Sequence, residues 1–425
     1  MTRLRYVCLG LISAALGSAS GLLLAGGSAV ALTAEQAQGP GTRDETVRSE
    51  VGNLLQAAQE LIRANRYKEA LAKIEETERV RDKTPYELYV IDRLRGAAAA
   101  GAGDTEVAIR SFESAIASGR LSQTETLQIM EALATLQYRN KNYADAIAWA
   151  LRYGKEGGTG DKMNRLLIQA YYLNNDFPNA ERELRSELQA DERSGRVPAE
   201  DRLQLLANCY LKQADTPGHI ATLEQLVTYY PKKEYWAELV YRIETRAGFA
   251  PRLGLDAYRL KLALGIPITA GQFVEATELA LQAGFPAEAK SFIDRGFAAG
   301  VLGSGADAER QRRLRDLATK GAADDQKTLA QDEAEASAAK DGTALVDTGF
   351  AYVVGGQLDR GIDLMERGIR KGGLKHPDDA ALHLGIAYLI GGHKEQAIRT
   401  FNSVRGADGC GDLARVWAIY AHRLA

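Results

Sequence analysis

The sequence predicts an all-α protein in which about ten helix hairpins follow one another in a linear array. Apolar residues make up 45% of the 425 residues but aromatic residues only 7%, and alanine and leucine are abundant, which favours helices over strands. From Val51 onward the apolar residues recur with a helical period. One arrangement of small and large residues also returns at intervals of 33 to 39 residues, as expected for repeated helix hairpins.

The N-terminal residues have the pattern of a secretory signal peptide. Arg3 and Arg5 precede an apolar run, and the tripeptide AVA that ends at Ala31 fits a cleavage site. We therefore predict a signal peptide over residues 1–31, with cleavage near Ala31 and a mature protein in the periplasm or outside the cell. In the alternative, residues 9–32 remain as an inner-membrane anchor, since they are long enough to span a bilayer. The mature chain is expected to lack a transmembrane span.

Residues 32–49 are polar, contain Gly-Pro-Gly, and are predicted to form a flexible lead-in. An array of helix hairpins is expected over residues 50–303. The clearest spacing rule lies near the C-terminus, where Tyr388, Ala397 and Phe401 follow Gly385 by three, twelve and sixteen residues. The reference positions that carry the same register along the array are Ala58, Gly96, Ala134, Ile168, Ala207, Val240 and Thr277.

These spacings resemble the tetratricopeptide repeat (TPR) family, in which small residues let two antiparallel helices touch and large residues fill the gaps. The resemblance implies a right-handed superhelical solenoid of TPR-like hairpins. Each hairpin is expected to turn at a short polar or glycine-containing segment. The predicted turns are Asn65-Arg66-Tyr67, Gly103, Lys141-Asn142-Tyr143, Asn175-Asp176-Phe177, Gly356 and Gly391-Gly392. Members of this family bind other proteins, so the resemblance implies a protein-interaction scaffold.

Residues 304–342 are expected to be helical but fit the repeat poorly. Leu314, Leu317 and Leu329 are nearly their only large apolar residues, while arginines crowd the first half and acids the second. A helix pair this polar would contribute little buried surface to its neighbours. We interpret the segment as a degenerate charged unit with a solvated outer face. The alternatives are a hinge before the last repeats and a charged arm that docks a partner.

Two regular repeats are predicted over residues 343–405, followed by a capping helix over residues 406–425. The final hairpin of a solenoid has no successor, so it needs a helix to cover its apolar side. The apolar residues that recur on one face of the last segment are Leu413, Val416, Trp417, Tyr420 and Leu424.

Motifs for catalysis or cofactor binding are missing from the sequence. It has no phosphate-binding GxxxxGK[ST], no GxSxG elbow and no HExxH. His376, His383 and His393 lack companion ligands at metal-binding spacing, and Cys209 has a position that favours a buried, inert thiol. The formal charge is −3 with both signs interspersed, which leaves no basic patch for nucleic acid. We expect a non-enzymatic protein without cofactor, metal or nucleic-acid partner.

The first helices of stacked hairpins line a concave groove. In the TPR family, defined positions of each repeat face that groove, and amide, basic and tyrosine groups there can hold an extended peptide. The groove residues that the resemblance implies are Arg93, Lys162, Arg165, Gln169, Tyr172, Gln204, Asn208, Lys212 and Tyr241. In the last two repeats the groove positions are apolar and suit either an apolar helix or internal packing. They are Val346, Phe350, Leu382, Ile386 and Leu389.

A second resemblance lies in residues 232–265 and continues through the stretch QAGFPAEAKSFIDRGFAAGVLG. It is similar to repeat proteins that accompany TonB-type systems in Gram-negative envelopes, and it implies envelope proteins of a TonB-like system as partners. Two other functions stay open. One is a structural or assembly role in the cell envelope through the outer faces. The other is an accessory protein that binds glycan or lipid near Trp236 and Tyr241.

Overall fold

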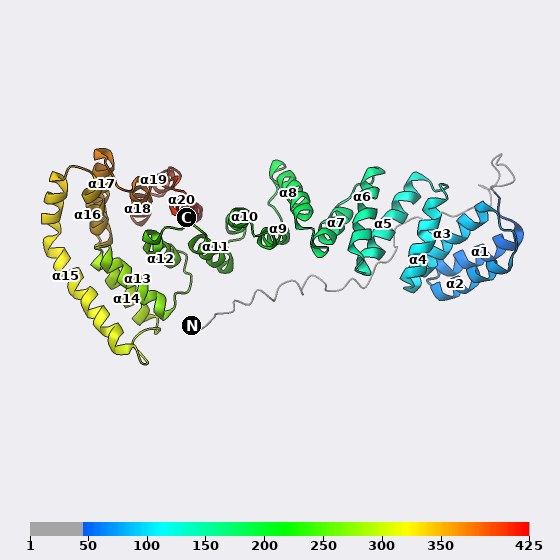
Figure 1. Ribbon diagram of the computed structural model, residues 1–425, viewed down its shortest axis with the longest axis horizontal. Coiled ribbons are helices and arrows are strands. Elements are labelled where there is room, and N and C mark those ends of the chain that lie inside the picture. The colour runs from blue at the N-terminus through cyan, green and yellow to red at the C-terminus, as the bar shows by residue number, and fades with distance from the viewer. Residues whose placement is uncertain (1–45, 425) are drawn as a thin grey trace. The chain divides into compact units, whose positions relative to one another are not determined.

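The computed structural model describes residues 46–424, so the predicted signal peptide and most of the lead-in lie outside the described residues. Within residues 46–424 the chain is helical and contains no strand, which confirms the predicted fold class (Figure 1). The chain divides into two compact units. Unit 1 ends at Asn174 and unit 2 begins at Asn175.

Unit 1 is a series of antiparallel hairpins in which each helix packs on the next along the chain. Its helices are α1 (Ser49–Arg63), α2 (Tyr67–Glu76), the short 3-10 helix η3 (Thr77–Arg79), α3 (Pro85–Ala102), α4 (Thr105–Ala117), α5 (Gln123–Arg139), α6 (Tyr143–Lys155) and α7 (Asp161–Leu173). The first helices of successive hairpins also contact one another, α1 with α3 and α5 with α7.

Unit 2 begins with further hairpins and ends with a single helix. Its helices are α8 (Phe177–Arg193), α9 (Glu200–Lys212), α10 (Thr216–Tyr229), α11 (Lys233–Thr245), the 3-10 helix η4 (Pro251–Leu253), α12 (Gly254–Ala263), α13 (Ala270–Gln282), α14 (Pro286–Ala298), α15 (Ala308–Ala338), α16 (Thr343–Val354), α17 (Leu358–Lys371), α18 (Pro377–Ile390), α19 (Lys394–Phe401) and α20 (Cys410–Arg423).

The hairpins turn by one recurring device. Two residues before the second helix, the chain adopts a left-handed conformation, for example at Gly103 (φ 81°) and Gly392 (φ 78°). The next residue then donates its backbone N–H to a carbonyl five residues earlier, as Asp104 does to Ala99, and this closes a Schellman motif. The residues with this left-handed conformation are Asn65, Gly103, Lys141, Asn175, Ala214, Gly284, Gly356 and Gly392. Every turn predicted from the sequence is confirmed.

The predicted contact between small and large residues is also present. A Cβ atom added to Gly385 would overlap the ring of Phe401, sixteen residues later, and one added to Gly96 would overlap the ring of Phe112. The glycines therefore let the two helices of a hairpin approach until the aromatic ring lies on the backbone. Ala58, Ala134 and Thr277 are fully buried at the corresponding positions of other hairpins.

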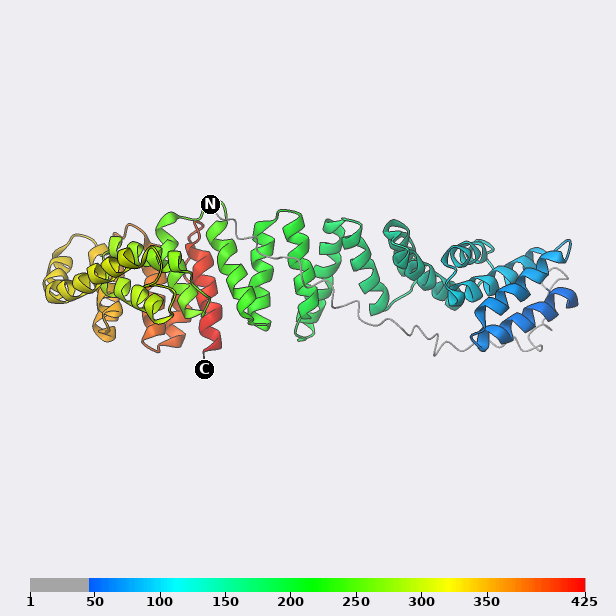
Figure 2. The same cartoon turned by 90° about the horizontal axis from the view of Figure 1, so that it is seen from below.

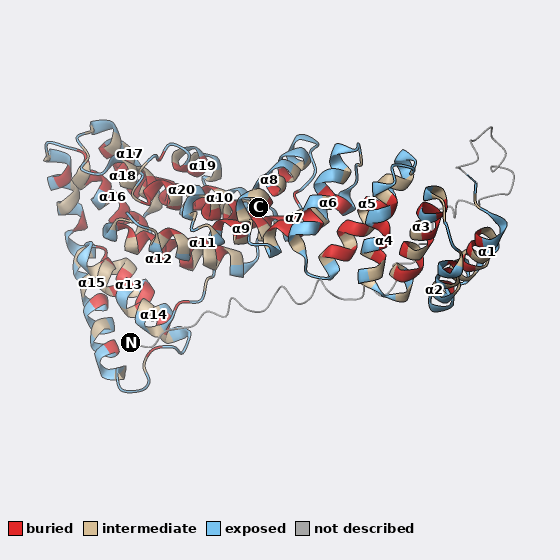
Figure 3. Ribbon diagram, turned by 45° about the vertical axis from the view of Figure 1, so that its right-hand side comes forward, coloured by how far each residue is buried: buried red, intermediate tan, exposed pale blue. Residues whose placement is uncertain are grey.

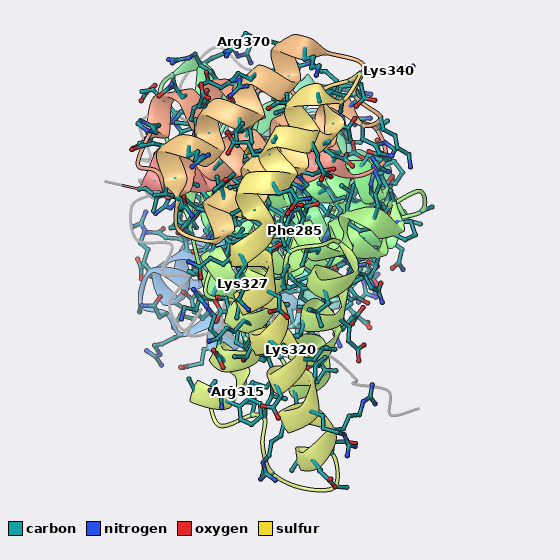
Figure 4. The ribbon with its side chains drawn as sticks, turned by 90° about the vertical axis from the view of Figure 1, so that its left-hand side faces the viewer. Phe285, Arg315, Lys320, Lys327, Lys340 and Arg370 are labelled. Carbon is teal, nitrogen blue, oxygen red and sulfur yellow. The ribbon has the colours of Figure 1, made fainter. Side chains whose placement is uncertain are left out.

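The prediction of a helix pair over residues 304–342 is wrong. This segment forms the single helix α15, which is 31 residues long. It packs on α13, α14 and α16, and the side of Gly321 that a Cβ would occupy faces Pro286. The expected solvated face is present, because only Gln311, Ala318, Leu329 and Ala336 are buried (Figure 3). Lys320 and Lys327 lie along its length (Figure 4).

Helix α12 is the central element of unit 2. All residues from Leu255 to Lys261 are buried, so the helix is enclosed on every side (Figure 3). Its Arg259 guanidinium forms ion pairs with Asp256 at 2.7 Å and with Glu288 of α14 at 2.6 Å. It also lies 4.5 Å from the centre of the Phe350 ring on α16. Burial disfavours the charge of Asp256, but His383 and Arg259 outweigh it and hold the pKa of that carboxyl far below its usual value.

The C-terminal helix α20 packs against both the last hairpin and the earlier helices of unit 2. It covers α18 and α19, as the predicted cap should, and it also packs against α10, α11 and α12 (Figure 2). Arg415 of α20 forms an ion pair with Glu224 of α10 at 3.0 Å. Nearby, Arg252 bridges Asp379 at 2.7 Å and Asp408 at 2.5 Å. Thus α20 joins the end of the chain to the middle of unit 2, a contact that the sequence analysis did not predict.

Candidate binding surface

Bonds between the first helices of neighbouring hairpins organise one exposed face of unit 1. Arg93 of α3 pairs with Glu125 of α5 at 2.5 Å, and Lys162 of α7 pairs with Glu131 of α5 at 2.6 Å. The hydroxyl of Tyr138 on α5 donates to the side-chain oxygen of Gln169 on α7 at 3.1 Å. We call this face the first-helix surface. Its residues are Arg93, Glu125, Glu131, Tyr138, Lys162, Arg165, Gln169 and Tyr172.

The structure therefore places the predicted groove residues of unit 1 on one surface, but several have partners within the chain. The Arg93 and Glu125 side chains are only 18% and 22% exposed, so their ion pair fixes α3 to α5. Burial alone would raise the pKa of Glu125, but hydrogen bonds from Ser122 and the charge of Arg93 lower it. The pair between Lys162 and Glu131 is more exposed and contributes little to stability.

Arg165 differs from its neighbours. It lies on the exposed face of α7, and within the described part of the chain it forms no hydrogen bond or ion pair. Tyr172 follows it by two helical turns and is half-buried. The next residue, Leu173, is a large apolar side chain that remains 42% exposed.

A second set of predicted groove residues lies on α9 and α11 in unit 2. The Gln204 side chain donates to the Tyr235 hydroxyl, which donates to Glu200, and Lys232 pairs with Glu200 at 2.5 Å. Hydrogen bonds from Lys232 and Tyr235 lower the pKa of Glu200. Gln204 thus belongs to a closed network that joins the two helices.

The remaining predicted residues of unit 2 are more accessible. Asn208 is half-buried and Lys212 is exposed, and neither has a polar partner among the described residues. Tyr241 on α11 is 48% exposed, with the Arg242 guanidinium 5.8 Å from its ring centre. Leu211, beside Lys212, is also exposed at 40%.

The apolar groove positions of the last two repeats serve internal packing. Val346, Phe350, Leu382 and Ile386 are all buried, and Leu389 is half-buried. Phe350 meets Phe285 at 5.3 Å between ring centres and stacks on His383 at 4.9 Å. Of the two uses considered for these positions, the structure thus shows packing within unit 2.

Several residues that sequence reasoning missed complete these surfaces, namely Glu125, Glu131, Tyr138, Glu200 and Tyr235. Each bonds to a residue 31 to 35 positions away, which is close to one repeat length. A search for opposite charges, or for polar pairs, at that separation would have found them.

The structure assigns packing roles to the residues considered for other chemistry. Cys209 is fully buried, and burial raises the pKa of its thiol to about 12, so the reactive thiolate is suppressed. His219 is buried, with its Nδ1 2.8 Å from the Ala207 carbonyl. Trp236 is 5% exposed and belongs to the core, so its side chain is not accessible to a glycan or lipid ligand. Residues 46–424 contain no cluster of three or more potential metal ligands.

Comparisons with known proteins support the repeat architecture. Residues 93–161, which include the α3 and α5 residues of the first-helix surface, match the family model described as tetratricopeptide repeat. No curated protein matches the chain. Across residues 46–424, none of the helices is both long enough and apolar enough to cross a membrane.

Solved helical proteins are similar to the chain at low identity. A complex described as Naa15/Naa10 bound to HypK-THB has 16% identity and a TM-score of 0.31, over 84% of this chain and 58% of that one. The apo form of RapI has 14% identity and a TM-score of 0.34, over 80% and 91%. The P58(IPK) TPR domain has 14% identity and a TM-score of 0.23, over 88% and 98%.

The family match covers α3 from Arg93 onward and all of α4, α5 and α6. These two hairpins supply Gly96, Phe112 and the Schellman turns at Gly103 and Lys141. The same turn recurs along both units, as does the small-to-large contact. Residues 93–161 of the chain are therefore tetratricopeptide repeats, and the hairpins outside this range show the same turn and the same small-to-large contact.

Proposed function

We propose that the protein is a non-enzymatic scaffold that binds segments of other proteins on the first-helix surface of unit 1. The observation that carries the proposal is the contrast between the first helices of unit 1 and those of the last two repeats. In unit 1 the first helices keep polar and tyrosine side chains at an exposed face, whereas α16 and α18 bury the corresponding positions against the rest of unit 2. Ion pairs of Arg93 with Glu125 and of Lys162 with Glu131 connect α3, α5 and α7, so the helices that carry the exposed groups are already positioned before binding.

Affinity on such a surface comes from a few aromatic and basic anchors rather than from area. Arg165 and Tyr172 are the anchors of unit 1, and Asn208, Lys212 and Tyr241 form a second group on unit 2. The accessible amide of Asn208 can bond a peptide backbone, and Lys212 can pair with a carboxylate.

In-cell photo-crosslinking tests this function. A photoreactive residue is placed at Arg165, Tyr172 or Lys212, and captured proteins are identified by mass spectrometry. Arg110 on α4 is the matched control, because it is an exposed arginine of unit 1 on a second helix. We expect the same discrete protein from Arg165 and Tyr172 and none from Arg110. Equal capture from Arg110, or no capture from either anchor, would contradict the proposal.

We also propose that the protein is exported after cleavage near Ala31, with the periplasm as its compartment. The support is the Arg3 and Arg5 region followed by the apolar run and small residues. N-terminal sequencing of the protein from cell fractions tests this, with a new N-terminus after Ala31 expected in the periplasmic or secreted fraction. An intact N-terminus in the membrane fraction would support the anchor instead. We propose envelope proteins of a TonB-like system as the partners, on the basis of the resemblance in residues 232–265 and the stretch QAGFPAEAKSFIDRGFAAGVLG.

An envelope assembly role through the outer faces is the second candidate. Its support is α15, whose long exposed face has no counterpart in a regular repeat. Photo-crosslinks from Lys320 and Lys327 would then capture a partner while those from Arg165 do not.

A further inference from the structure

Helix α15 carries a stripe of exposed side chains opposite its buried residues Ala318, Leu329 and Ala336. The helix is 31 residues long, which corresponds to about 46 Å at 1.5 Å per residue, and it runs along the near side of unit 2 in Figure 4. The exposed residues recur at alternating steps of four and three, as on the contact face of two paired helices. We call them the outer stripe: Arg313, Leu317, Lys320, Asp324, Lys327 and Gln331.

Other charges of α15 fix the helix on its neighbours. Arg310 pairs with Glu278 of α13 at 3.1 Å, and Arg315 pairs with Asp294 of α14 at 2.6 Å. Toward the other end, the Glu333 carboxylate pairs with α17 at 2.6 Å. None of these residues belongs to the outer stripe, so the charges of the stripe are not needed to hold α15 on unit 2.

The charges of the outer stripe have weak partners or none. Lys320 forms no hydrogen bond or ion pair within the described part of the chain. Asp324 pairs with Lys327 of the same helix at 2.9 Å, but the two side chains are 54% and 73% exposed. Arg313 pairs with Glu309 at 3.1 Å and is similarly exposed. Because such pairs contribute little to stability, these groups can form contacts with a partner at small cost.

The charge of α15 is divided between its two halves. Residues 308–321 contain five basic and two acidic residues, whereas residues 322–338 contain one basic and five acidic residues. The formal charges of the halves are therefore +3 and −4. A second α15 in the parallel direction would place like charges opposite each other, whereas the antiparallel direction places each basic half on an acidic half. The stripe then meets itself across a two-fold axis, as in most homodimers.

We propose that two copies of the protein form a dimer in which the outer stripes of their α15 helices pack antiparallel. When the two stripes are centred on each other, Lys320 of each copy lies opposite Asp324 of the other, so this ion pair occurs twice. Leu317, which is 57% exposed, then packs on the aliphatic part of Lys327. The second copy is the occupant because it supplies a complementary charge pattern of the same length. This inference goes beyond the proposed function, which concerns the first-helix surface of unit 1.

Analytical ultracentrifugation of the purified protein measures the dimer. We expect association that increases with protein concentration and weakens about tenfold between about 0.05 M and 0.5 M NaCl, because salt screens exposed charges. Carbodiimide crosslinking of mixed isotope-labelled and unlabelled protein gives the direction of packing. A link between Lys320 of one copy and Asp324 of the other is expected.

Two charge reversals identify the contact. Lys320→Glu alone places two acids opposite each other, and Asp324→Lys alone places two lysines opposite each other, so each variant should bind itself about tenfold more weakly. A mixture of the two variants restores both ion pairs across the interface, although each helix keeps its own altered charge. We therefore expect the mixture to associate about as tightly as the unchanged protein. Arg110→Glu in unit 1 is the matched control, because it is exposed and changes the net charge as Lys320→Glu does, and it should have no effect.

A protein that stays monomeric at every concentration, or a dimer that neither reversal weakens, would overturn the proposal. A mixture that associates no better than the single variants would also contradict it. If the purified protein is monomeric while photo-crosslinks from Lys320 capture a different protein, that protein occupies the stripe and the proposed dimer is wrong. None of these outcomes changes the crosslinks expected from Arg165, so the proposed function is tested separately.

Discussion

Gly385 and Phe401 show how one missing side chain sets the distance between two helices. A Cβ on Gly385 would overlap the Phe401 ring, which is 1% exposed and has little room to move. We predict that Gly385→Ala lowers the free energy of unfolding by about 1–3 kcal/mol, because overpacking forces the ring or the backbone to shift. Thermal or urea unfolding measures this, and adding Phe401→Leu should restore part of the loss.

Gly154 in α6 is the control for that substitution. It is helical, and a Cβ placed on it has no heavy atom within 4 Å. Gly154→Ala is therefore expected to be neutral or to stabilise by up to about 1 kcal/mol through helix propensity. A similar loss from both variants would show that packing against Phe401 is not the cause.

The buried carboxylate of Glu87 makes the stability of unit 1 depend on pH in the acidic range. Arg48 donates to it from its side chain at 2.8 and 2.9 Å and from its backbone at 2.9 Å. Thr84 donates its backbone N–H within the capping box of α3. The hydrogen bonds from Arg48 outweigh burial and lower the pKa of Glu87 to about 2.

Because this pKa is lower in the folded state than the unfolded value of about 4.3, the ionised Glu87 stabilises the fold above about pH 4.3. That stabilisation is lost as the pH falls toward about 2. We predict that Glu87→Gln costs about 1–3 kcal/mol at neutral pH and flattens the loss of stability between about pH 4.3 and 2. Urea unfolding at a series of pH values measures this. A profile parallel to that of the unchanged protein, or the same flattening from exposed Glu106→Gln, would refute it.

The turns that join the helices carry strain that depends on residue type. Ala214 has a φ of 57°, a left-handed conformation that costs a non-glycine residue about 1 kcal/mol, whereas Gly103 has a φ of 81° at the equivalent position without that cost. We predict that Ala214→Gly stabilises the protein and Gly103→Ala destabilises it, each by about 1 kcal/mol. Unfolding of both variants checks the pair, and changes of the same sign in both would contradict the prediction.

For the helices and turns, the sequence predicted the structure best where the contacts are between residues close together in the chain. The hairpins depend on residues sixteen positions apart, such as Gly385 and Phe401, and their turns on single residues, so a spacing pattern predicted them. The pattern failed for α15 because a highly charged segment with few apolar residues does not distinguish one helix from two. In α15 the only glycine, Gly321, packs against Pro286 instead of turning the chain.

For the candidate surface, the repeat spacing assigned Arg93, Lys162 and Gln169 to first helices, and the structure has them there. Their bonds to Glu125, Glu131 and Tyr138 could not be predicted, because they depend on how one repeat packs on the next. The packing of α20 against α10, α11 and α12 could not be predicted either, because it joins residues that are many repeats apart. Arg415 and Glu224 are 191 residues apart, and no repeat pattern connects them.

For the whole molecule, we predict that α20 stabilises distant helices. Trp417→Ala removes a side chain that is 4% exposed and should cost about 3–5 kcal/mol in unit 2. A stop codon after Ser403 should expose the amides of α10, α11 and α12 to hydrogen exchange. Unit 1 serves as the internal control, and its amides should exchange as before. Unchanged protection of α10 to α12 would mean that α20 only caps the last hairpin.

The contact of α20 with α10, α11 and α12 also bears on the order in which the chain acquires its structure. The hairpins of unit 1 are complete as soon as their own residues leave the ribosome, so they can form during synthesis. Unit 2 must wait for the last residues of the chain, because Arg415 and the rest of α20 arrive 191 residues after their partner Glu224. During that interval the apolar surface that α20 will cover stays open. Slow translation, or a truncated product, would therefore leave unit 2 exposed to aggregation and proteolysis while unit 1 is already folded.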